Sequence, residues 1–164
     1  MGDITLAVDM GPDFEREWPG ADRHATECVL NVSYLYMQLS AFGQALISRH
    51  GVPSIAAFNV LTILHGAGEP LPPSVIAERM VVSRPTMTGI VRSLSQRGFI
   101  RSMPHPTDGR MMLIEITDAG TARVEQLRPE LHQAEKRWIS CLSTDEKETL
   151  LHLLARLQAN AQTA

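Results

Sequence analysis

Apolar residues recur at helical spacing in three long segments of the chain. The first segment follows Asp22 and carries Cys28, Val32, Leu35, Leu39, Phe42 and Leu46 before Gly51 and Pro53 interrupt it. Steps of three and four residues place these side chains on one face of a helix. Asp22 has the side chain of an N-cap, because its carboxylate can accept a hydrogen bond from an unpaired backbone N–H. The pattern predicts a long amphipathic helix that begins at Asp22.

The other two long segments lie near the C-terminus. One follows a predicted cap at Asp118 and carries Val124, Leu127, Leu131, Ala134, Trp138 and Cys141; the other carries Leu150, Leu153, Leu154 and Leu157. Ser143-Thr144-Asp145-Glu146 precedes the last segment and has the pattern of a capping box, in which the first and fourth side chains accept hydrogen bonds from each other's backbone. Two further amphipathic helices are predicted.

Shorter elements are predicted between these segments. The run from Ile55 to Leu64 is apolar on nearly every side and indicates a buried helix. A short helix capped by Ser74 and ending at Met80 comes next, followed by one that Ser83 caps and that has Pro85 in its first turn. The inward face of this second helix consists of Met87, Ile90, Val91 and Leu94. Two such helices joined by a few residues form a helix-turn-helix pattern.

A β-hairpin is predicted directly after the helix-turn-helix. Phe99 to Met103 and Met111 to Thr117 are strand-like and flank the turn-forming residues 104–110. The expected fold class is therefore mainly α with a small hairpin wing. Residues 53–117 are expected to form a winged helix-turn-helix domain, residues 22–52 and 118–164 a helical region, and residues 1–21 a loose or partly docked arm.

Composition narrows the class of protein. The chain has 164 residues, 44% of them apolar, which suffices for one domain with its own core. No apolar run approaches the ~20 residues of a membrane helix, and the N-terminal residues lack the basic region of a signal peptide, so a cytoplasmic location is expected. Neither the two cysteines nor the six histidines have metal-ligand spacing. No standard catalytic motif is found, so neither an enzyme nor a cofactor is expected.

Charge is unevenly distributed along the chain. Residues 79–110 contain six arginines and one acid, a net charge of +5, so the rest of the chain must carry −8 to give the total of −3. The arginines are Arg79, Arg84, Arg92, Arg97, Arg101 and Arg110, and the acid is Asp108. A solvated basic helix face and a surface for a polyanion both agree with this distribution.

The run IAERMVVSRPTMTGIVRSLSQRGFIRSMPHPTDGRMMLIEITDAG, residues 76–120, resembles the winged helix-turn-helix of MarR-type transcriptional regulators. The order of helices on either side, from about Arg23 to Ala161, also agrees with that family. The resemblance implies a homodimer, formed by the helices at both ends of the chain, that binds a pseudo-palindromic operator in double-stranded DNA. It further implies a repressor that a small, often aromatic, ligand releases from the operator.

The candidate DNA-binding residues are Ser83, Arg84, Pro85, Thr86, Thr88, Arg92, Asp108 and Arg110. The start of the helix at Ser83, with its free N–H groups and the Thr86 hydroxyl, suits a phosphate. Arg84, Thr88 and Arg92 share an outward sector and can reach base edges, although both arginines can bind phosphate instead. The resemblance implies that Arg110, beside Asp108 in the wing, enters the minor groove; an ion pair within the hairpin is the alternative.

Three alternatives concern the regulatory half of the chain. Tyr34, Tyr36, Met37 and His65 are candidates for a ligand pocket between the long helices and the winged domain, but such residues also serve as ordinary packing. Cys28 is a candidate redox sensor, as in some relatives. Its place on the apolar stripe instead predicts a buried and inert thiol. A remote alternative is an adaptor that binds protein through its winged helix.

Overall fold

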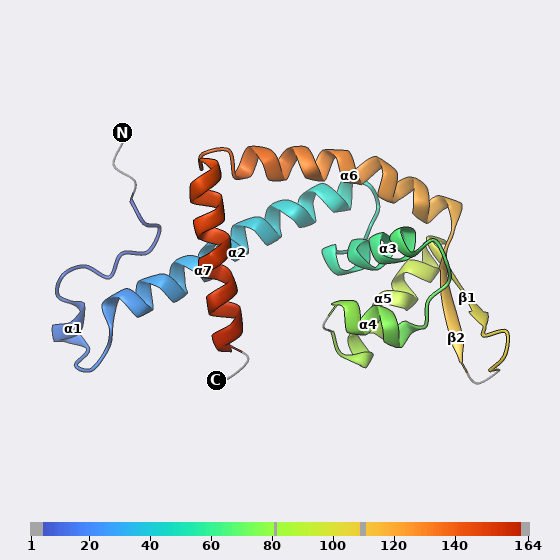
Figure 1. The fold of residues 1–164 in the computed structure, drawn as a ribbon, viewed down its shortest axis with the longest axis horizontal. Helices are drawn as coiled ribbons and strands as arrows, with labels where there is room; N and C mark the ends of the chain where they lie inside the picture. Colours follow the sequence, from blue (N-terminus) through green and yellow to red (C-terminus); the bar gives the residue numbers. More distant parts are fainter. Residues whose placement is uncertain (1–4, 81, 109–110, 162–164) are drawn as a thin grey trace.

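The computed structural model describes residues 5–80, 82–108 and 111–161. In chain order its elements are α1 (Phe14–Glu17), α2 (Arg23–Arg49), α3 (Ile55–Ala67), α4 (Pro73–Met80), α5 (Arg84–Gln96), β1 (Ile100–Pro104), β2 (Met112–Ile116), α6 (Asp118–Trp138) and α7 (Thr144–Ala161). Figure 1 shows α3, α4, α5 and both strands gathered into one part of the molecule, from which α2 and α6 extend. We call this part the winged lobe. It confirms the predicted fold class, mainly helical with a hairpin wing.

Helix α3 is the centre of the winged lobe. Its Val60 and Leu61 are fully buried, as are Val124 and Leu127 of α6. Helix α3 contacts α2, α4, α5, α6 and β2, which accounts for its apolar character on nearly every side. The prediction of a buried helix in this segment is therefore confirmed.

Most of the predicted helix caps form. Asp22 accepts a hydrogen bond at 3.0 Å from the backbone N–H three residues on, and Ser83 does the same at 3.4 Å. The capping box at the start of α7 is complete, because the Ser143 N–H donates to Glu146 Oε2 at 2.8 Å and the Glu146 N–H donates to Ser143 Oγ at 3.3 Å. Local sequence thus determines where these helices begin.

Two predicted helix starts are wrong, the start of α6 by one residue and that of α4 by two. Thr117, not Asp118, is the N-cap of α6, and its hydroxyl accepts the Gly120 N–H at 3.2 Å. Asp118 is instead the first helical residue, where its negative charge interacts favourably with the helix dipole. Helix α4 begins at Pro73 rather than after Ser74, because a proline at the first helical position needs no N–H partner.

The wing contains a short third strand contact. Strands β1 and β2 pair antiparallel, with Ile100 opposite Ile116 and Ser102 opposite Ile114. Leu71 then pairs with Ile114 through two backbone hydrogen bonds of 2.9 and 2.8 Å. Leu71 lies among four residues of which the other three are prolines, so it carries the N–H that this segment can offer to the sheet. The contact joins the wing to the start of α4.

Thr117 joins the wing to α6. Its N–H donates to the carbonyl of Phe99 at 3.0 Å, and its hydroxyl donates to the carbonyl of Gly98 at 2.7 Å. Gly120, one turn into α6, lies directly against the same Phe99 carbonyl. The hairpin is thereby fixed to the helix that leads away from the winged lobe.

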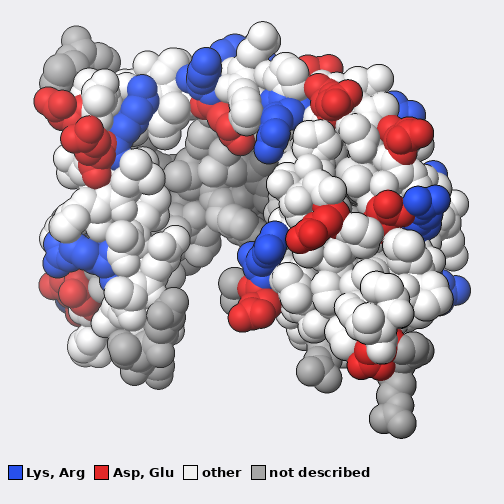
Figure 2. Space-filling model, turned by 45° about the vertical axis from the view of Figure 1, so that its right-hand side comes forward, with Lys and Arg blue, Asp and Glu red and all other residues white. Residues whose placement is uncertain are grey.

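Much of the apolar surface of the two terminal helices is uncovered. On α2 the predicted stripe is exposed from Cys28 to Phe42, with Leu35 44% exposed, and is buried at Leu46. No residue of α7 is buried. Figure 2 shows a deep hollow between the part of the molecule that contains α7 and the winged lobe. Among the described residues, no helix combines the length and apolar character needed to cross a bilayer.

Part of the N-terminal arm is bound to the start of α2. The Val8 N–H donates to Asn31 Oδ1 at 3.1 Å, and Asn31 Nδ2 donates to the Val8 carbonyl at 2.8 Å. The Met10 N–H donates to the buried Glu27 carboxylate at 3.1 Å. Arg23 pairs with Glu27 at 2.8 Å and with Asp9, in the arm, at 3.1 Å. These contacts form a latch between the arm and one face of α2.

We expect this latch to open in acid. The hydrogen bond from Arg23 lowers the pKa of Glu27 from its ordinary value of 4.5, and the Met10 N–H acts in the same direction. Because the folded-state pKa is below the unfolded one, the contribution of Glu27 is fully present above pH 4.5 and is lost as pH falls through the folded value. Hydrogen exchange of the Val8 and Met10 amides, corrected for intrinsic rate, should show lost protection in this range.

Glu27→Gln separates charge from hydrogen bonding in this experiment. Glutamine keeps an acceptor for the Met10 N–H but loses the ion pair with Arg23, so protection should fall severalfold at neutral pH and lose its acid transition. Glu125→Gln, at an exposed position on α6, is the matched control and should resemble the wild type. An acid transition that persists in Glu27→Gln would assign it to another group.

Candidate nucleic-acid interface

The start of α5 is an exposed helix N-terminus. Ser83 and Thr86 are both exposed, and their hydroxyl oxygens are 2.8 Å apart. Pro85 is exposed in the first turn, where its missing N–H removes no intrahelical bond. The partial positive charge of such a terminus attracts phosphate, and the serine and threonine hydroxyls are additional donors.

Helix α5 separates an inner from an outer face. Met87 and Leu94 are 2% and 0% exposed, whereas Thr88 and Arg92 are exposed one turn apart on the outer face. Arg84 is the first residue of α5, but its side chain lies outside the described part of the structure. The outer face of α5 thus exposes a hydroxyl and a guanidinium, two side-chain types that can hydrogen-bond to base edges in a major groove.

The basic run is only partly available to a ligand. Arg79, Arg92 and Arg97 are exposed and form no ion pair with another described residue. Arg101 instead pairs across the hairpin with Glu115, which raises the pKa of the guanidinium. On the face drawn in Figure 2, acidic and basic side chains are interspersed. The charge separation seen along the sequence therefore does not produce a continuous basic patch on that face.

The end of the wing is organised by a residue that the sequence pattern did not single out. His105 Nδ1 accepts hydrogen bonds from the backbone N–H groups of Thr107 and Asp108, both at 3.3 Å. Asp108 is exposed, and its carbonyl accepts the Met111 N–H at 2.9 Å. The predicted minor-groove residue Arg110 lies outside the described residues. In the sequence, these hydrogen bonds to His105 are signalled only by a histidine that stands between two prolines, three residues before an aspartate.

The structure places the candidate ligand-pocket residues Tyr36 and His65 at two different hollows. Tyr36 lines a hollow of about 420 Å³ between α2, α3 and the turn before α5. His65 lines a separate hollow of about 240 Å³ on the far side of α3, together with Glu69 and Glu115. Tyr34 and Met37 are exposed on α2. Helical spacing places residues on a face but does not say which other element faces them.

The hollow around Tyr36 has other lining residues that the sequence pattern did not indicate. Leu39, Ile55 and Asn59 line both this hollow and a neighbouring one of about 260 Å³ that extends to α6. The two hollows follow the junction between α2 and α3. Both hollows have walls from α2 and α3; the end of α4 and the turn after it complete the first, and α6 completes the second. Spacing within one helix does not show which other elements complete such a wall.

Cys28 is exposed, so the prediction of a buried thiol is wrong for this chain. It lines an open surface hollow together with Leu153, Arg156 and Leu157 of α7. The physical reason is that the apolar stripe of α2 to which Cys28 belongs is exposed from Cys28 to Phe42, and the hollow between it and α7 is open.

The lobe built from α3, α4, α5 and the hairpin defines a winged helix-turn-helix protein. The model of the MarR family matches residues 54–112, which span this lobe from α3 to the start of β2. An HTH-type transcriptional regulator of Mycobacterium leprae is 31% identical over 101 residues, covering 59% of this chain and 67% of the relative. The chain belongs to the MarR family.

A second relative is also an HTH-type transcriptional regulator. The HTH-type transcriptional regulator YwaE of Bacillus subtilis is 32% identical over 88 residues, covering 54% of this chain and 52% of YwaE. The matched part thus spans about half to two thirds of these two relatives. Both relatives are named as regulators and not as enzymes.

Solved structures share the fold. A "probable transcriptional regulator" from Pseudomonas aeruginosa is 28% identical with a TM-score of 0.63, covering 77% of this chain and 96% of its own. MepR of S. aureus, solved as a complex with DNA, has a TM-score of 0.70 at 18% identity, with 79% and 93% covered. PcaV of Streptomyces coelicolor, in complex with its natural ligand, has a TM-score of 0.67 at 23% identity, with 96% and 99% covered. The last two likenesses concern the fold alone.

Proposed function

We propose that this protein is a cytoplasmic, homodimeric transcriptional regulator that binds a pseudo-palindromic operator in double-stranded DNA and acts as a repressor. The observation that carries the proposal is helix α5, which is capped at Ser83 and exposes Thr88 and Arg92 on the surface of a MarR-family winged lobe. The MepR–DNA complex supports it, because a protein of the same fold is solved there with DNA.

Each candidate residue has a distinct role in this proposal. Ser83, Pro85 and Thr86 place the start of α5 against a phosphate, which sets the register of the helix without reading sequence. Arg84, Thr88 and Arg92 read base edges in the major groove. Arg110, which lies outside the described residues, enters the adjacent minor groove, and Asp108 shapes the turn that carries it.

The dimer follows from the uncovered surfaces of α2 and α7. Both helices expose several large apolar side chains, among them Val32, Leu35, Leu153 and Leu157. Contiguous apolar surface of this kind is typical of a site that another molecule covers. A twofold dimer buries the same surface of both copies and places two α5 helices on successive half-sites.

Release of the operator by a small ligand, aromatic in many relatives, is the regulatory part of the proposal. The hollows at the α2–α3 junction, one of them lined by Tyr36, are the candidate site. They connect the helices of the proposed dimer with the turn that leads into α5. The PcaV complex supports ligand binding by a protein of this fold.

The proposed function predicts steep salt dependence. A dimer that contacts six or more phosphates should lose roughly a thousandfold in affinity for its operator duplex between about 50 and 200 mM salt. Genomic fragments retained by the purified protein supply the duplex, and fluorescence anisotropy measures its affinity. A protein-binding adaptor would retain no specific fragment and show no such slope with duplex DNA.

Arg92→Ala distinguishes base reading from phosphate contact. If Arg92 reads a base, the variant should bind the operator about tenfold more weakly and tolerate changes at one base pair. If Arg92 contacts phosphate, affinity should fall equally for all sequences and the salt slope should decrease by about one. Arg137→Ala, at an exposed position on α6, is the control for loss of one positive charge. Equal binding by both variants would remove α5 from the interface.

A further inference from the structure

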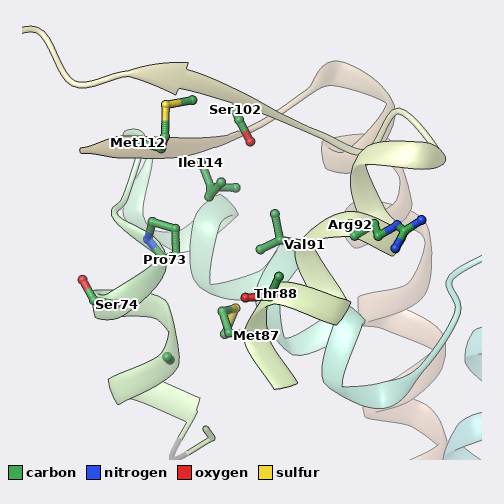
Figure 3. Close-up of a pocket in the computed structure, with 10 residues that line it drawn as sticks. Pro73, Ser74, Met87, Thr88, Val91, Arg92, Ser102, Met112 and Ile114 are labelled. Carbon is green, nitrogen blue, oxygen red and sulfur yellow. The ribbon is translucent and has the colours of Figure 1, made fainter. Parts of the chain in front are cut away.

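The end of the wing lies beyond the reach of the core. Strand pairing stops at Pro104 and Met112, and none of residues 105–108 is buried. The base of the wing is held by packing: β1 contacts α5, and Figure 3 shows Ile114 of β2 and Val91 of α5 pointing into the space between hairpin and helix. The conformation of residues 105–108 therefore depends on hydrogen bonds within the turn.

His105 is at the centre of these hydrogen bonds. Its N–H donates to the carbonyl of Met111 at 2.9 Å, and the Met111 N–H donates to the carbonyl of Asp108 at 2.9 Å. Between these two bonds, Nδ1 of the His105 ring accepts the N–H groups of Thr107 and Asp108, both at 3.3 Å. Because Pro106 has no N–H, the ring satisfies each backbone donor of residues 106–108.

The donors of this turn determine which ring nitrogen carries the proton. A backbone N–H can only donate, so Nδ1 of His105 is unprotonated and the proton of the neutral ring is on Nε2. A protonated imidazole has no acceptor, because both nitrogens carry hydrogen. The Thr107 hydroxyl, 3.3 Å from Nδ1, can accept from the protonated nitrogen, but the two N–H groups lose their partner. Protonation of His105 is thus incompatible with this turn.

We propose that His105 is a positioning residue for DNA binding: its neutral ring fixes the end of the wing in the conformation that contacts the duplex, and its protonation releases that end. Asparagine and aspartate commonly close such turns by accepting the N–H two residues on. Histidine changes charge between about pH 5 and 8, whereas an amide does not titrate, so this turn is linked to pH. The inference rests on the proposed function, in which the wing contacts DNA.

The charged surroundings of the ring do not replace the lost acceptor. The ion pairs among the described residues do not include His105, and Arg101 and Glu115 pair with each other further along the hairpin. The other described charged or titratable side chains of the hairpin, of α3, α4 and α5 and of the first two turns of α6 are Asp108, His65, Glu78, Arg79, Arg92, Asp118 and Arg123.

Protonation of His105 has two opposed effects on operator affinity. An imidazolium attracts phosphate, which strengthens binding and weakens as salt is added. Loss of the two hydrogen bonds leaves a turn that must be ordered again on DNA, which weakens binding by roughly fivefold and does not depend on salt. We therefore expect weaker binding in acid, most clearly at about 200 mM salt, where the attraction is screened.

NMR spectra of the free protein test the turn without DNA. Long-range proton–nitrogen correlations of the His105 ring should show Nδ1 unprotonated and the proton on Nε2 at neutral pH. On acidification, the amide protons of Thr107 and Asp108 should shift with the same midpoint as the ring and lose protection from exchange. A proton on Nδ1 at neutral pH, or amides that do not follow the titration of the ring, would overturn the inference.

Two substitutions of His105 separate the place of the acceptor from its presence. His105→Asn puts Oδ1 where Nδ1 lies, because both atoms are bonded to Cγ, whereas His105→Gln carries the same amide one bond further from the backbone. At neutral pH, His105→Asn should bind the operator duplex as tightly as the wild type, and His105→Gln roughly fivefold more weakly, the scale of two lost hydrogen bonds. Equal binding by all three would remove the ring from the positioning of the wing.

The pH profile of operator affinity, measured by fluorescence anisotropy at about 200 mM salt, tests the role of the proton. The wild type should lose roughly fivefold between about pH 8 and pH 5, whereas His105→Asn, which keeps every other titrating group, should not. His132→Asn, at an exposed position on α6, is the matched control and should follow the wild type.

Two outcomes of the pH profile count against the inference in different ways. If the wild type bound more tightly in acid than His105→Asn, attraction between imidazolium and phosphate would dominate and the inference would be overturned, while the proposed function would stand. If the protein bound no duplex at any pH, the proposed function would fail and the role of His105 in DNA binding with it, although the NMR spectra would still decide the protonation state of the turn.

Discussion

Gly120→Ala should lower the free energy of unfolding by at least about 2 kcal/mol, the scale of overpacking in a rigid site. A β-carbon at this position would lie 2.2 Å from the carbonyl oxygen of Phe99 and 2.8 Å from Cγ1 of Ile116. Both distances are far below contact, and the nearer atom belongs to the backbone. The substitution therefore cannot be accommodated by a side-chain rotation.

The Phe99 carbonyl also cannot move away freely. It accepts the Thr117 N–H at 3.0 Å, while Phe99 itself is 7% exposed and packed in the core. Separating α6 from the hairpin would break this bond and the one from Thr117 to Gly98. Thermal or urea unfolding at a fixed protein concentration measures the loss, since stability of a dimer depends on concentration.

Gly66→Ala is the matched control for this experiment. Gly66 lies inside α3, and a β-carbon there would meet no atom within 4 Å. Alanine is favoured over glycine in a helix interior by about 0.5 to 1 kcal/mol, so this variant should be slightly more stable than the wild type. If Gly120→Ala proved equally stable, the contact between wing and α6 would be wrong.

The elements that the sequence predicted well are those that local physics determines. Asp22, Ser83 and Ser143 cap helices through their own side chains, so neighbouring residues suffice to locate them. The inner face of α5, with Met87 and Leu94, follows from helical spacing alone. Once the buried face of α5 is known, Thr88 and Arg92 must lie on its exposed face. The orientation of α5 was therefore predictable before its surroundings were known.

Contacts between distant segments were not predictable in the same way. Leu71 and Ile114 pair although 42 residues lie between them in the chain, and Asn31 holds Val8 through a side-chain amide. In neither pair does the spacing of the residues along the sequence indicate that they are in contact. The pairing of Arg101 with Glu115 likewise depends on the register of the hairpin, so the net charge of the run overstated the charge available to DNA.

Pockets are the least predictable features for a related reason. The hollow of about 460 Å³ between α4, α5 and the hairpin and the hollow around Tyr36 each need walls from three or more elements, and their volumes depend on how those elements pack. Tyr34 and Tyr36 differ by two positions, which separates their directions on α2 by about 200°. A list of aromatic residues near one another in sequence is thus a poor guide to one site.

Replacing both Leu153 and Leu157 by Glu should convert the proposed dimer into monomers. These side chains are 46% and 57% exposed on α7, which has no buried residue within the chain. Burying a leucine is worth about 1.5 to 3 kcal/mol, so losing two should weaken dimerisation more than about a hundredfold, before the cost of burying charge is counted. Sedimentation equilibrium measures the dissociation constant directly.

The fold of the winged lobe should survive the double substitution, because α7 contributes nothing to its core. The circular dichroism spectrum should therefore keep its helical shape, while operator affinity falls sharply, since one α5 reads only a half-site. Gln158→Glu adds negative charge at an exposed polar position of α7 and should leave the dimer nearly unchanged. If the double variant remained dimeric, α7 would lie outside the subunit interface. If the double variant were monomeric yet bound the operator at full strength, recognition would not require two copies of α5.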